Sequence, residues 1–226
     1  MTSAVEFIFS LERFGMKFGL ANIARLCAAL GHPETAFPSI IVAGTNGKGS
    51  VTAMVDAAMR AAGHRTARYT SPHLVRIEER FVIDGREVDP ATLEAAAETV
   101  KRAAEDLVAS RTLEALPTFF ECTTAIAFVL FRDAGVDLAI LEVGLGGRLD
   151  ATNVVSPIAA AIVSIDFDHQ AQLGNTLTSI AAEKAGVIKP KSLVVLGANP
   201  AAVQEVVRGA ADRAGATLVM APESVR

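Results

Sequence analysis

Residues 39–63, "SIIVAGTNGKGSVTAMVDAAMRAAG", carry the clearest structural pattern in the sequence. The stretch begins with a short apolar run rich in β-branched residues, which is typical of a buried strand. A Gly-rich turn follows, and then an Ala-rich helical pattern that ends at Gly63, a residue suited to a C-cap. Backbone N–H groups in such a turn, at a helix N-terminus, form a concave anion site. The stretch therefore predicts a strand, a phosphate-binding loop and a helix, with Lys48 placed to reach terminal phosphates.

The loop "GTNGKGS", residues 44–50, departs from the common phosphate loop. The common motif has four residues before its Gly-Lys pair and a Ser or Thr directly after the lysine. Here only Thr45 and Asn46 precede the pair, and Gly49 takes the place of the hydroxyl. Because Ser50 comes one residue late for the usual Mg²⁺ role, another oxygen ligand is expected elsewhere. A Gly-rich turn with an exposed lysine is the less favoured interpretation.

Strand and helix patterns alternate along the rest of the chain. Asp84-Gly85, between alternating apolar residues, predicts a hairpin. Alternation at these lengths predicts an α/β fold with a mostly parallel sheet and helices on both faces. In such sheets ligands bind beyond the carboxyl ends of the strands. Further strands are expected at 65–70, 136–144, 158–166, 192–197 and 217–220, and helices at 89–110, 117–135, 178–188 and 200–215.

Composition excludes several classes of protein. With 226 residues, 51% hydrophobic and 20% charged, the chain suits a packed soluble globule, which we expect to be a single domain over residues 1–226. A net charge of -4 argues against a broad basic surface for nucleic acid. No apolar run is long enough to span a bilayer and the N-terminus lacks a signal-peptide pattern, so we expect no membrane association and a cytoplasmic location. Cys27 and Cys122, in helical patterns, are expected to be reduced core thiols.

Polar residues follow the predicted strands in three further places. In "YTSPHL", Ser71 could supply the missing hydroxyl. In "LEVG", Glu142 ends a buried strand, where a carboxylate needs either Mg²⁺ bound to phosphates or a salt bridge, for instance with Arg148. In "DFDHQ", His169 alone would be an ordinary loop histidine, but beside the other groups it becomes a candidate metal ligand. For Lys184, in "EKAG", the residues alone favour an ordinary surface lysine.

Five motifs together resemble one family. "VAGTNGKGSV", "TSPHLVRIEERFVIDG", "LEVGLGGRLDATN", "DHQAQLG" and "IAAEKAGVIKP" occur in the order seen in the dihydrofolate synthase/folylpolyglutamate synthase family. This family belongs to the Mur-ligase superfamily of ATP-dependent amide-bond ligases. The resemblance runs from about "MKFGLANI" to the last predicted strand. It implies the P-loop-containing α/β fold of a Mur-ligase central domain.

The resemblance also implies roles for the nucleotide and metal groups. The serine of "TSPHL", the glutamate of "LEVG" and the histidine of "DHQ" bind Mg²⁺ in the family, as one or two ions. The lysine of "EKAG" is carbamylated there and helps to bind metal, which reverses the expectation for Lys184. The implied ATP contacts are Thr45, Asn46, Gly47, Lys48, Gly49 and Ser50, the implied metal ligands are Ser71, Glu142, His169 and Lys184, and the implied catalytic groups are Lys48, Glu142, His169 and Lys184.

The pterin-bearing substrate is implied to lie along "TFFE" and "RLDA", with a contribution from "KFGL" near the N-terminus. In the family, the carboxylate of dihydropteroate or a reduced folate is activated by ATP as an acyl phosphate and joined to L-glutamate. The implied substrate contacts are Gly19, Leu20, Thr118, Phe119, Phe120, Glu121, Leu149, Asp150 and Ala151.

Family members continue into a C-terminal domain that contributes adenine contacts and much of the glutamate site, and this chain does not contain it. We therefore expect the isolated chain to bind nucleotide weakly, to ligate poorly and to expose an apolar patch. Two alternatives stay open. A muramyl-peptide or cyanophycin-type ligase is disfavoured by "SPHLVR" and "RLDATN", and a non-catalytic nucleotide-binding remnant is disfavoured by the intact site residues.

Overall fold

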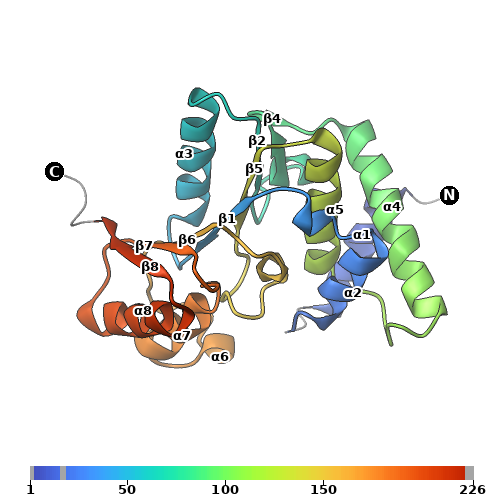
Figure 1. Cartoon of the computed structure of the whole chain (residues 1–226). Coiled ribbons are helices and arrows are strands. Elements are labelled where there is room, and N and C mark those ends of the chain that lie inside the picture. Colours follow the sequence, from blue (N-terminus) through green and yellow to red (C-terminus); the bar gives the residue numbers. More distant parts are fainter. Residues whose placement is uncertain (1–2, 16–18, 222–226) are drawn as a thin grey trace.

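The computed structural model describes residues 3–15 and 19–221. In this part of the chain eight strands form one sheet, in the order β4-β3-β2-β5-β1-β6-β7-β8, with helices on both faces (Figure 1). The strands are β1 (Ser39–Ala43), β2 (Thr66–Tyr69), β3 (Phe81–Ile83), β4 (Arg86–Glu87), β5 (Leu138–Glu142), β6 (Ala159–Ile162), β7 (Leu193–Leu196) and β8 (Thr217–Met220). The α-helices are α1 (Ala4–Ser10), α2 (Ala21–Ala29), α3 (Lys48–Ala61), α4 (Pro90–Ala109), α5 (Phe119–Ala134), α6 (Gln170–Leu173), α7 (Leu177–Ala185) and α8 (Ala201–Ala214), and short 3-10 helices are η1 (Leu11–Phe14), η2 (Pro33–Thr35), η3 (Ile77–Arg80) and η4 (Ala151–Val154).

The sheet is mostly parallel, as predicted. Strands β2, β5, β1, β6, β7 and β8 run parallel to one another, whereas β3 pairs antiparallel with both β2 and β4 at one edge. The predicted hairpin joins β3 to β4, and Asp84 and Gly85 have φ of 50° and 76°. Positive φ at both central residues is what a type I′ hairpin turn requires. The α/β class and the hairpin are both confirmed.

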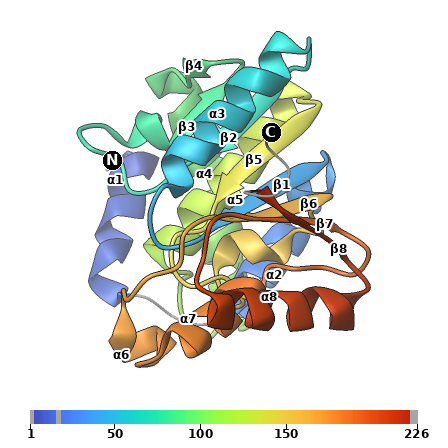
Figure 2. The same ribbon diagram turned by 90° about the vertical axis from the view of Figure 1, so that its left-hand side faces the viewer.

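Alternating side chains of the strands pack against different helices. Figures 1 and 2 show α3 on one face of the sheet and α5 on the other, with α1, α2 and α4 outside α5 and with α7 and α8 beneath β6, β7 and β8. In β1, Ile41 belongs to the cluster that includes α7 and α8, whereas Val42 packs with α3. The period-2 pattern of a strand thus gives each face its own core.

The core contains both cysteines. Cys27 and Cys122 are buried and unpaired, in α2 and α5. Burial in apolar surroundings raises the pKa of both thiols well above the usual range. The prediction of two buried thiols is confirmed.

One carboxylate of α3 is completely buried. Asp56 is 0% exposed and accepts a hydrogen bond from the Thr66 hydroxyl. Its Oδ2 also lies 3.4 Å from Arg60 Nε and 3.8 Å from Arg68 Nη1. Because a buried charge is tolerated only with partners, this cluster joins α3 firmly to β2.

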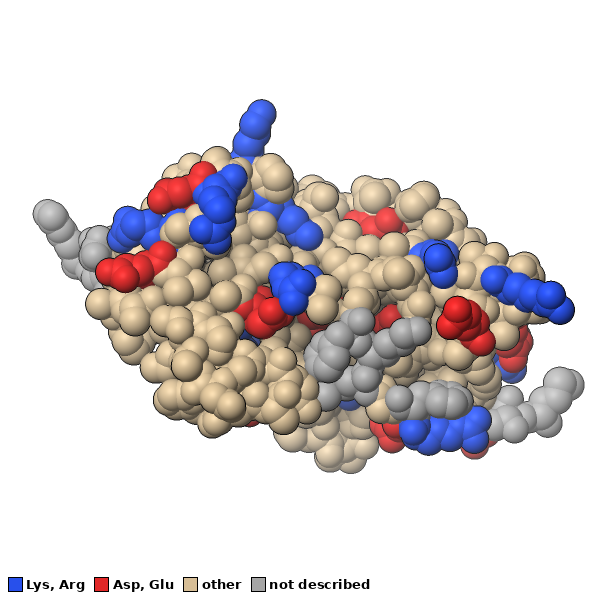
Figure 3. All heavy atoms as spheres, turned by 90° about the horizontal axis from the view of Figure 1, so that it is seen from below, with Lys and Arg blue, Asp and Glu red and all other residues tan. Residues whose placement is uncertain are grey.

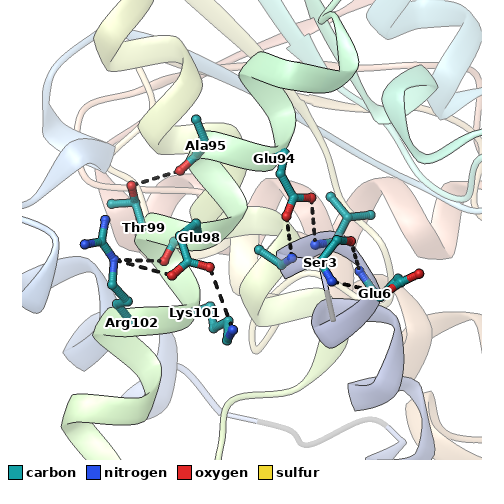
Figure 4. A network of polar contacts seen from close by, with 10 residues as sticks. Ser3, Glu6, Glu94, Ala95, Glu98, Thr99, Lys101 and Arg102 are labelled. Carbon is teal, nitrogen blue, oxygen red and sulfur yellow. Dashed lines mark hydrogen bonds and ion pairs between the residues drawn. The ribbon is translucent and has the colours of Figure 1, made fainter. Parts of the chain in front are cut away.

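A polar network not expected from the sequence fixes α1 on α4 (Figure 4). The Glu94 carboxylate of α4 accepts hydrogen bonds from the backbone N–H groups of Ala4 and Val5, in the first turn of α1. These N–H groups have no partner within the helix, so Glu94 acts as an external N-cap. The anchored helix places Phe9 against Phe119 of α5, with ring centroids 5.7 Å apart.

The predicted motifs lie at the carboxyl ends of the parallel strands. Strand β1 lies between β5 and β6, and the chain leaves β1, β2, β5 and β6 at the same end because these strands are parallel. This is the position at which ligands bind in open α/β sheets.

Charge is mixed on the face of the molecule that is seen from below. Figure 3 shows acidic and basic side chains interspersed on the face seen from below, with uncharged residues between them. Among the described residues, no helix is both long enough and apolar enough to cross a membrane.

Candidate functional site

The Gly-rich loop joins the end of β1 to the start of α3. Its Thr45 N–H donates to the Ser164 carbonyl at 2.7 Å, and its Thr45 hydroxyl donates to the Asp166 carbonyl at 3.1 Å, so the loop is tied to the segment after β6. Gly47 is the N-cap of α3, with φ of 87° and without a side-chain cap. The Gly49 N–H of this turn interacts with the Glu142 carboxylate. The turn has no side-chain cap, so its other first N–H groups can bind an anion, which the positive end of the helix dipole also favours.

Lys48 is the first residue of α3 and folds back over the loop. Its Nζ donates to the carbonyls of Gly44 and Thr45, both at 3.2 Å. Asn46 and Gly47 are exposed beside it, and Ser50 is exposed on α3. The predicted nucleotide residues thus form one continuous loop and helix start.

Glu142 faces this loop from the end of β5. It is 5% exposed, its Oε2 accepts the Ser71 N–H at 3.1 Å, and a Cβ on Gly49 would lie 3.6 Å from the same oxygen. Burial raises the pKa of Glu142, and the Ser71 N–H and the positive charge of Lys48 oppose the shift. The alternative of a salt bridge with Arg148 is wrong.

Arg148 instead pairs with Glu183 of α7, with Nη2 2.9 Å from Oε1. The loop carrying Arg148 lies very close to α7, because a Cβ on Gly147 would come within 2.8 Å of the Lys184 carbonyl. Glycine is needed at 147 for this approach, which fixes the helix that carries Lys184.

Lys184 is buried rather than exposed. Its side chain reaches the phosphate loop, where Nζ donates to the Gly44 carbonyl at 2.8 Å, and the residue is 3% exposed. Burial, with repulsion from Lys48 second, lowers the pKa of Lys184 to about 8. The interpretation as an ordinary surface lysine, which the residues alone favoured, is therefore wrong.

His169 is the most open of the predicted metal ligands. It precedes the short helix α6, with φ of 49°, and its half-exposed ring lies 3.5 Å from Asp168. Within the described residues, no three His, Cys, Asp or Glu side chains gather into a metal-binding cluster. The Ser71 hydroxyl and Glu142 carboxylate are oxygen donors of the kind Mg²⁺ prefers, so this part of the set fits the ion. An ammonium has no lone pair, so Lys184 fits only after modification.

A cavity of about 300 Å³ opens beside the phosphate loop. Eight of the nine predicted substrate residues line it. Leu20 does not, and Lys17 and Phe18 of "KFGL" lie outside the described residues. The lining residues are Gly19, Ser71, Pro72, Arg80, Thr118, Phe119, Phe120, Glu121, Gly144, Leu145, Leu149, Asp150, Ala151 and His169.

The walls of the cavity are largely apolar. Phe119 and Phe120 come from the start of α5, and Leu145 and Leu149 come from the loop after β5. A Cβ on Gly144 would lie 2.6 Å from Phe120 Cζ, so the ring occupies the space that any larger residue would need. Aromatic and aliphatic walls of this kind suit a flat ring system.

The two carboxylates of the cavity already have partners. Glu121 accepts the Thr118 N–H at 2.7 Å and the Thr118 hydroxyl at 2.9 Å, in a capping box at the start of α5. Asp150 accepts the Leu145 N–H at 2.9 Å and the Thr152 N–H at 3.0 Å. In this structure these hydrogen bonds fix the backbone segments that form the cavity walls.

Sequence reasoning missed Arg80. It lies in η3, is 6% exposed and lines the cavity. Its Nε donates to His73 Nδ1 at 2.8 Å, and its guanidinium carbon lies 5.2 Å from the centre of the Phe119 ring. In the sequence it is one arginine in a charged run, and only the fold brings it to the site.

The comparisons with known proteins agree with this geometry. No protein-family model matches the chain. It is 40% identical over 211 residues to the dihydrofolate synthase/folylpolyglutamate synthase of Bacillus subtilis. The aligned region covers 93% of this chain and 49% of that protein. A Mycobacterium tuberculosis folylpolyglutamate synthase structure with ADP has a TM-score of 0.89 at 38% identity, covering 96% of this chain and 50% of that one.

E. coli FolC in complex with DHPP and ADP has a TM-score of 0.87 at 34% identity, covering 97% of this chain and 51% of that one. The chain spans about half the length, or less, of the curated relatives that it matches. Its sheet and flanking helices follow the Mur-ligase arrangement of these structures. Sequence identity, fold and coverage together show that the chain belongs to the dihydrofolate synthase/folylpolyglutamate synthase family.

Proposed function

We propose that this chain is the ATP- and pterin-binding part of a ligase that joins a pteroate or folate carboxylate to L-glutamate. One observation carries the proposal: Ser71 belongs both to the phosphate site and to the apolar cavity. Its N–H is bound to Glu142 beside the loop, and the residue also lines the cavity. A nucleotide on the loop and a flat acceptor in the cavity would therefore meet at Ser71. Relatives bound to ADP, AMPPCP and DHPP support both ligand classes.

The chemistry requires an activated carboxylate. Oxide is a poor leaving group, so the γ-phosphoryl group of ATP is transferred to the acceptor carboxylate to give an acyl phosphate and ADP. The amine of glutamate then attacks the acyl carbon, phosphate leaves and an amide forms. Phosphoryl transfer depends on positioning and charge neutralisation. Lys48 and the first N–H groups of α3 would hold the phosphates for this step.

Ser71, Glu142 and His169 are the proposed Mg²⁺ ligands, and bound Mg²⁺ would supply further neutralisation of phosphate charge. Lys184 is the proposed carbamylation site. Reaction with carbon dioxide needs the neutral amine, and a pKa of about 8 leaves an appreciable neutral fraction near neutral pH. The carbamate would convert a buried cation into an anionic oxygen ligand. A carbamate signal with ¹³C-labelled bicarbonate, absent in Lys184→Met, is the expected NMR result.

Residues 1–226 would form one domain of the ligase. The remaining half of the relatives' length would contribute adenine contacts and the glutamate site, and the acceptor would be dihydropteroate, a reduced folate or both. A cytoplasmic location agrees with the two unpaired core thiols.

Ligase activity tests the proposal. The purified chain would receive Mg-ATP, L-glutamate and either dihydropteroate or tetrahydrofolate, and ADP release and product mass would both be followed. We expect little product from the chain alone and clear product when the C-terminal half of a relative is added in trans. Absence of product and of ADP release under both conditions, with folded protein, would contradict it.

A further inference from the structure

Arg80 is a buried cation with no close ion pair among the described residues. In that part of the chain no carboxylate lies within 4.0 Å of its guanidinium, and its contacts are His73 Nδ1 and the Phe119 ring. Its sequence neighbour Glu79 is not an ion-pair partner, because that carboxylate accepts hydrogen bonds from the backbone N–H groups of residues 74–76. Buried charges in proteins are normally paired. An anion from outside the chain is therefore the missing partner.

The cavity limits what this anion can be. Arg80 lines the same 300 Å³ space as Phe119, Phe120 and Leu149, so the anion must belong to a ligand with an apolar body. A guanidinium matches a carboxylate in a planar, two-point contact.

The position of Arg80 relative to Glu142 narrows the choice further. Arg80 lines the same cavity as Ser71, and the Ser71 N–H donates to Glu142 Oε2 at 3.1 Å beside the phosphate loop. Arg80 thus reaches the end of the cavity that adjoins the phosphate site. An acceptor carboxylate that must meet the γ-phosphoryl group has to lie in this region.

We infer that Arg80 binds the reacting carboxylate of the acceptor and so selects aromatic ligands that carry a carboxylate. This assignment rests on the proposed function. His73 is then a positioning residue, because its Nδ1 accepts the Nε–H and fixes the plane of the guanidinium. Phe119 supports the same side chain from its ring face.

The test compares pteroic acid with its carboxamide, which has nearly the same shape but no charge. Dissociation constants for both would be measured by calorimetry on the wild-type chain, Arg80→Met and Arg80→Lys, without Mg²⁺ or nucleotide. The matched control is Arg102→Met, since Arg102 lies on the outer face of α4 beside Glu98 (Figure 4). Thermal unfolding of each variant would show that it is folded, and AMPPCP affinity would be measured in parallel.

We expect the wild-type chain and Arg102→Met to prefer the acid by roughly ten- to a hundredfold, as a charged hydrogen-bonded pair implies. In Arg80→Met the two ligands should bind about equally, while Arg80→Lys keeps part of the preference. Equal binding of acid and amide by the wild type would overturn the role of Arg80 and leave the proposed function standing. Loss of AMPPCP affinity alone in Arg80→Met would instead assign Arg80 to the nucleotide. Failure of the wild type to bind either ligand would overturn both proposals.

Discussion

Replacing Lys184 with methionine removes a buried positive charge, and we expect it to raise the free energy of unfolding at pH 7. The folded state lowers the pKa of Lys184 from 10.5 to about 8, so its charged form is disfavoured in the fold. A shift of that size corresponds to about 3 kcal/mol at neutral pH. Loss of the hydrogen bond to the Gly44 carbonyl should offset about 1 kcal/mol of the gain.

The pH dependence is the sharper part of this prediction. Between the two pKa values the unfolded chain binds more protons than the folded one, so wild-type stability should rise with pH as the lysine loses its proton in the fold. The advantage of Lys184→Met should therefore be about 2.5 kcal/mol smaller at pH 10 than at pH 7. The lost hydrogen bond and altered packing contribute almost equally at both pH values and cancel in this difference.

Urea unfolding of both proteins at pH 7 and pH 10 would measure it, in buffer freed of carbon dioxide so that the amine stays unmodified. Lys101→Met is the matched control, because Lys101 lies beside Glu98 near the surface of α4. A stability difference between Lys184→Met and the wild type that is the same at both pH values would show that the charge of Lys184 does not destabilise the fold.

Three further substitutions test other parts of the structure. Gly144→Ala should destabilise the folded chain by about 1–3 kcal/mol and weaken pteroate binding, because its Cβ would lie 2.6 Å from Phe120. Thermal unfolding and calorimetry would measure the two effects. The control Gly209→Ala on α8, whose Cβ has its nearest contact at 3.4 Å, should show neither loss. Glu142→Gln should keep or raise stability at pH 7, since burial raises the pKa of Glu142 and disfavours its charge, yet should abolish Mg²⁺-dependent AMPPCP binding; a large loss of stability in urea would contradict this. Asp56→Asn should lower the free energy of unfolding by about 2–4 kcal/mol, measured by urea titration, because it leaves two arginines without their buried partner; a change below about 1 kcal/mol would argue against a firm cluster.

Local patterns in the sequence were sufficient for most of the fold. The strand, Gly-rich turn and helix around Lys48 form as predicted, and so does the Asp84-Gly85 hairpin, because each depends on residues next to one another. Helix α1 was not predicted. Its start is capped by Glu94, a residue 90 positions away from Ala4, and no local pattern contains that contact.

Candidate site residues could be identified where they belong to a sequence motif. Their burial and hydrogen-bond partners could not, because tertiary packing determines them. Lys184 looks like a surface lysine beside Glu183, and its burial follows from the close approach of Gly147 to α7. Glu121 and Asp150 are expected substrate contacts and line the cavity, and their carboxylates also accept hydrogen bonds from local backbone N–H groups. Such competition between a ligand and the chain itself cannot be seen without coordinates.

The most direct test of the central proposal is whether a nucleotide and a pterin bind together. Calorimetric titration of pteroate into the wild-type chain, with and without saturating Mg-AMPPCP, would be compared with the same titrations of Lys48→Met. We expect one pteroate per chain in both wild-type titrations, and loss of AMPPCP but not of pteroate binding in Lys48→Met. Displacement of pteroate by AMPPCP, or pteroate binding that Lys48→Met abolishes, would contradict adjacent sites at this edge of the sheet.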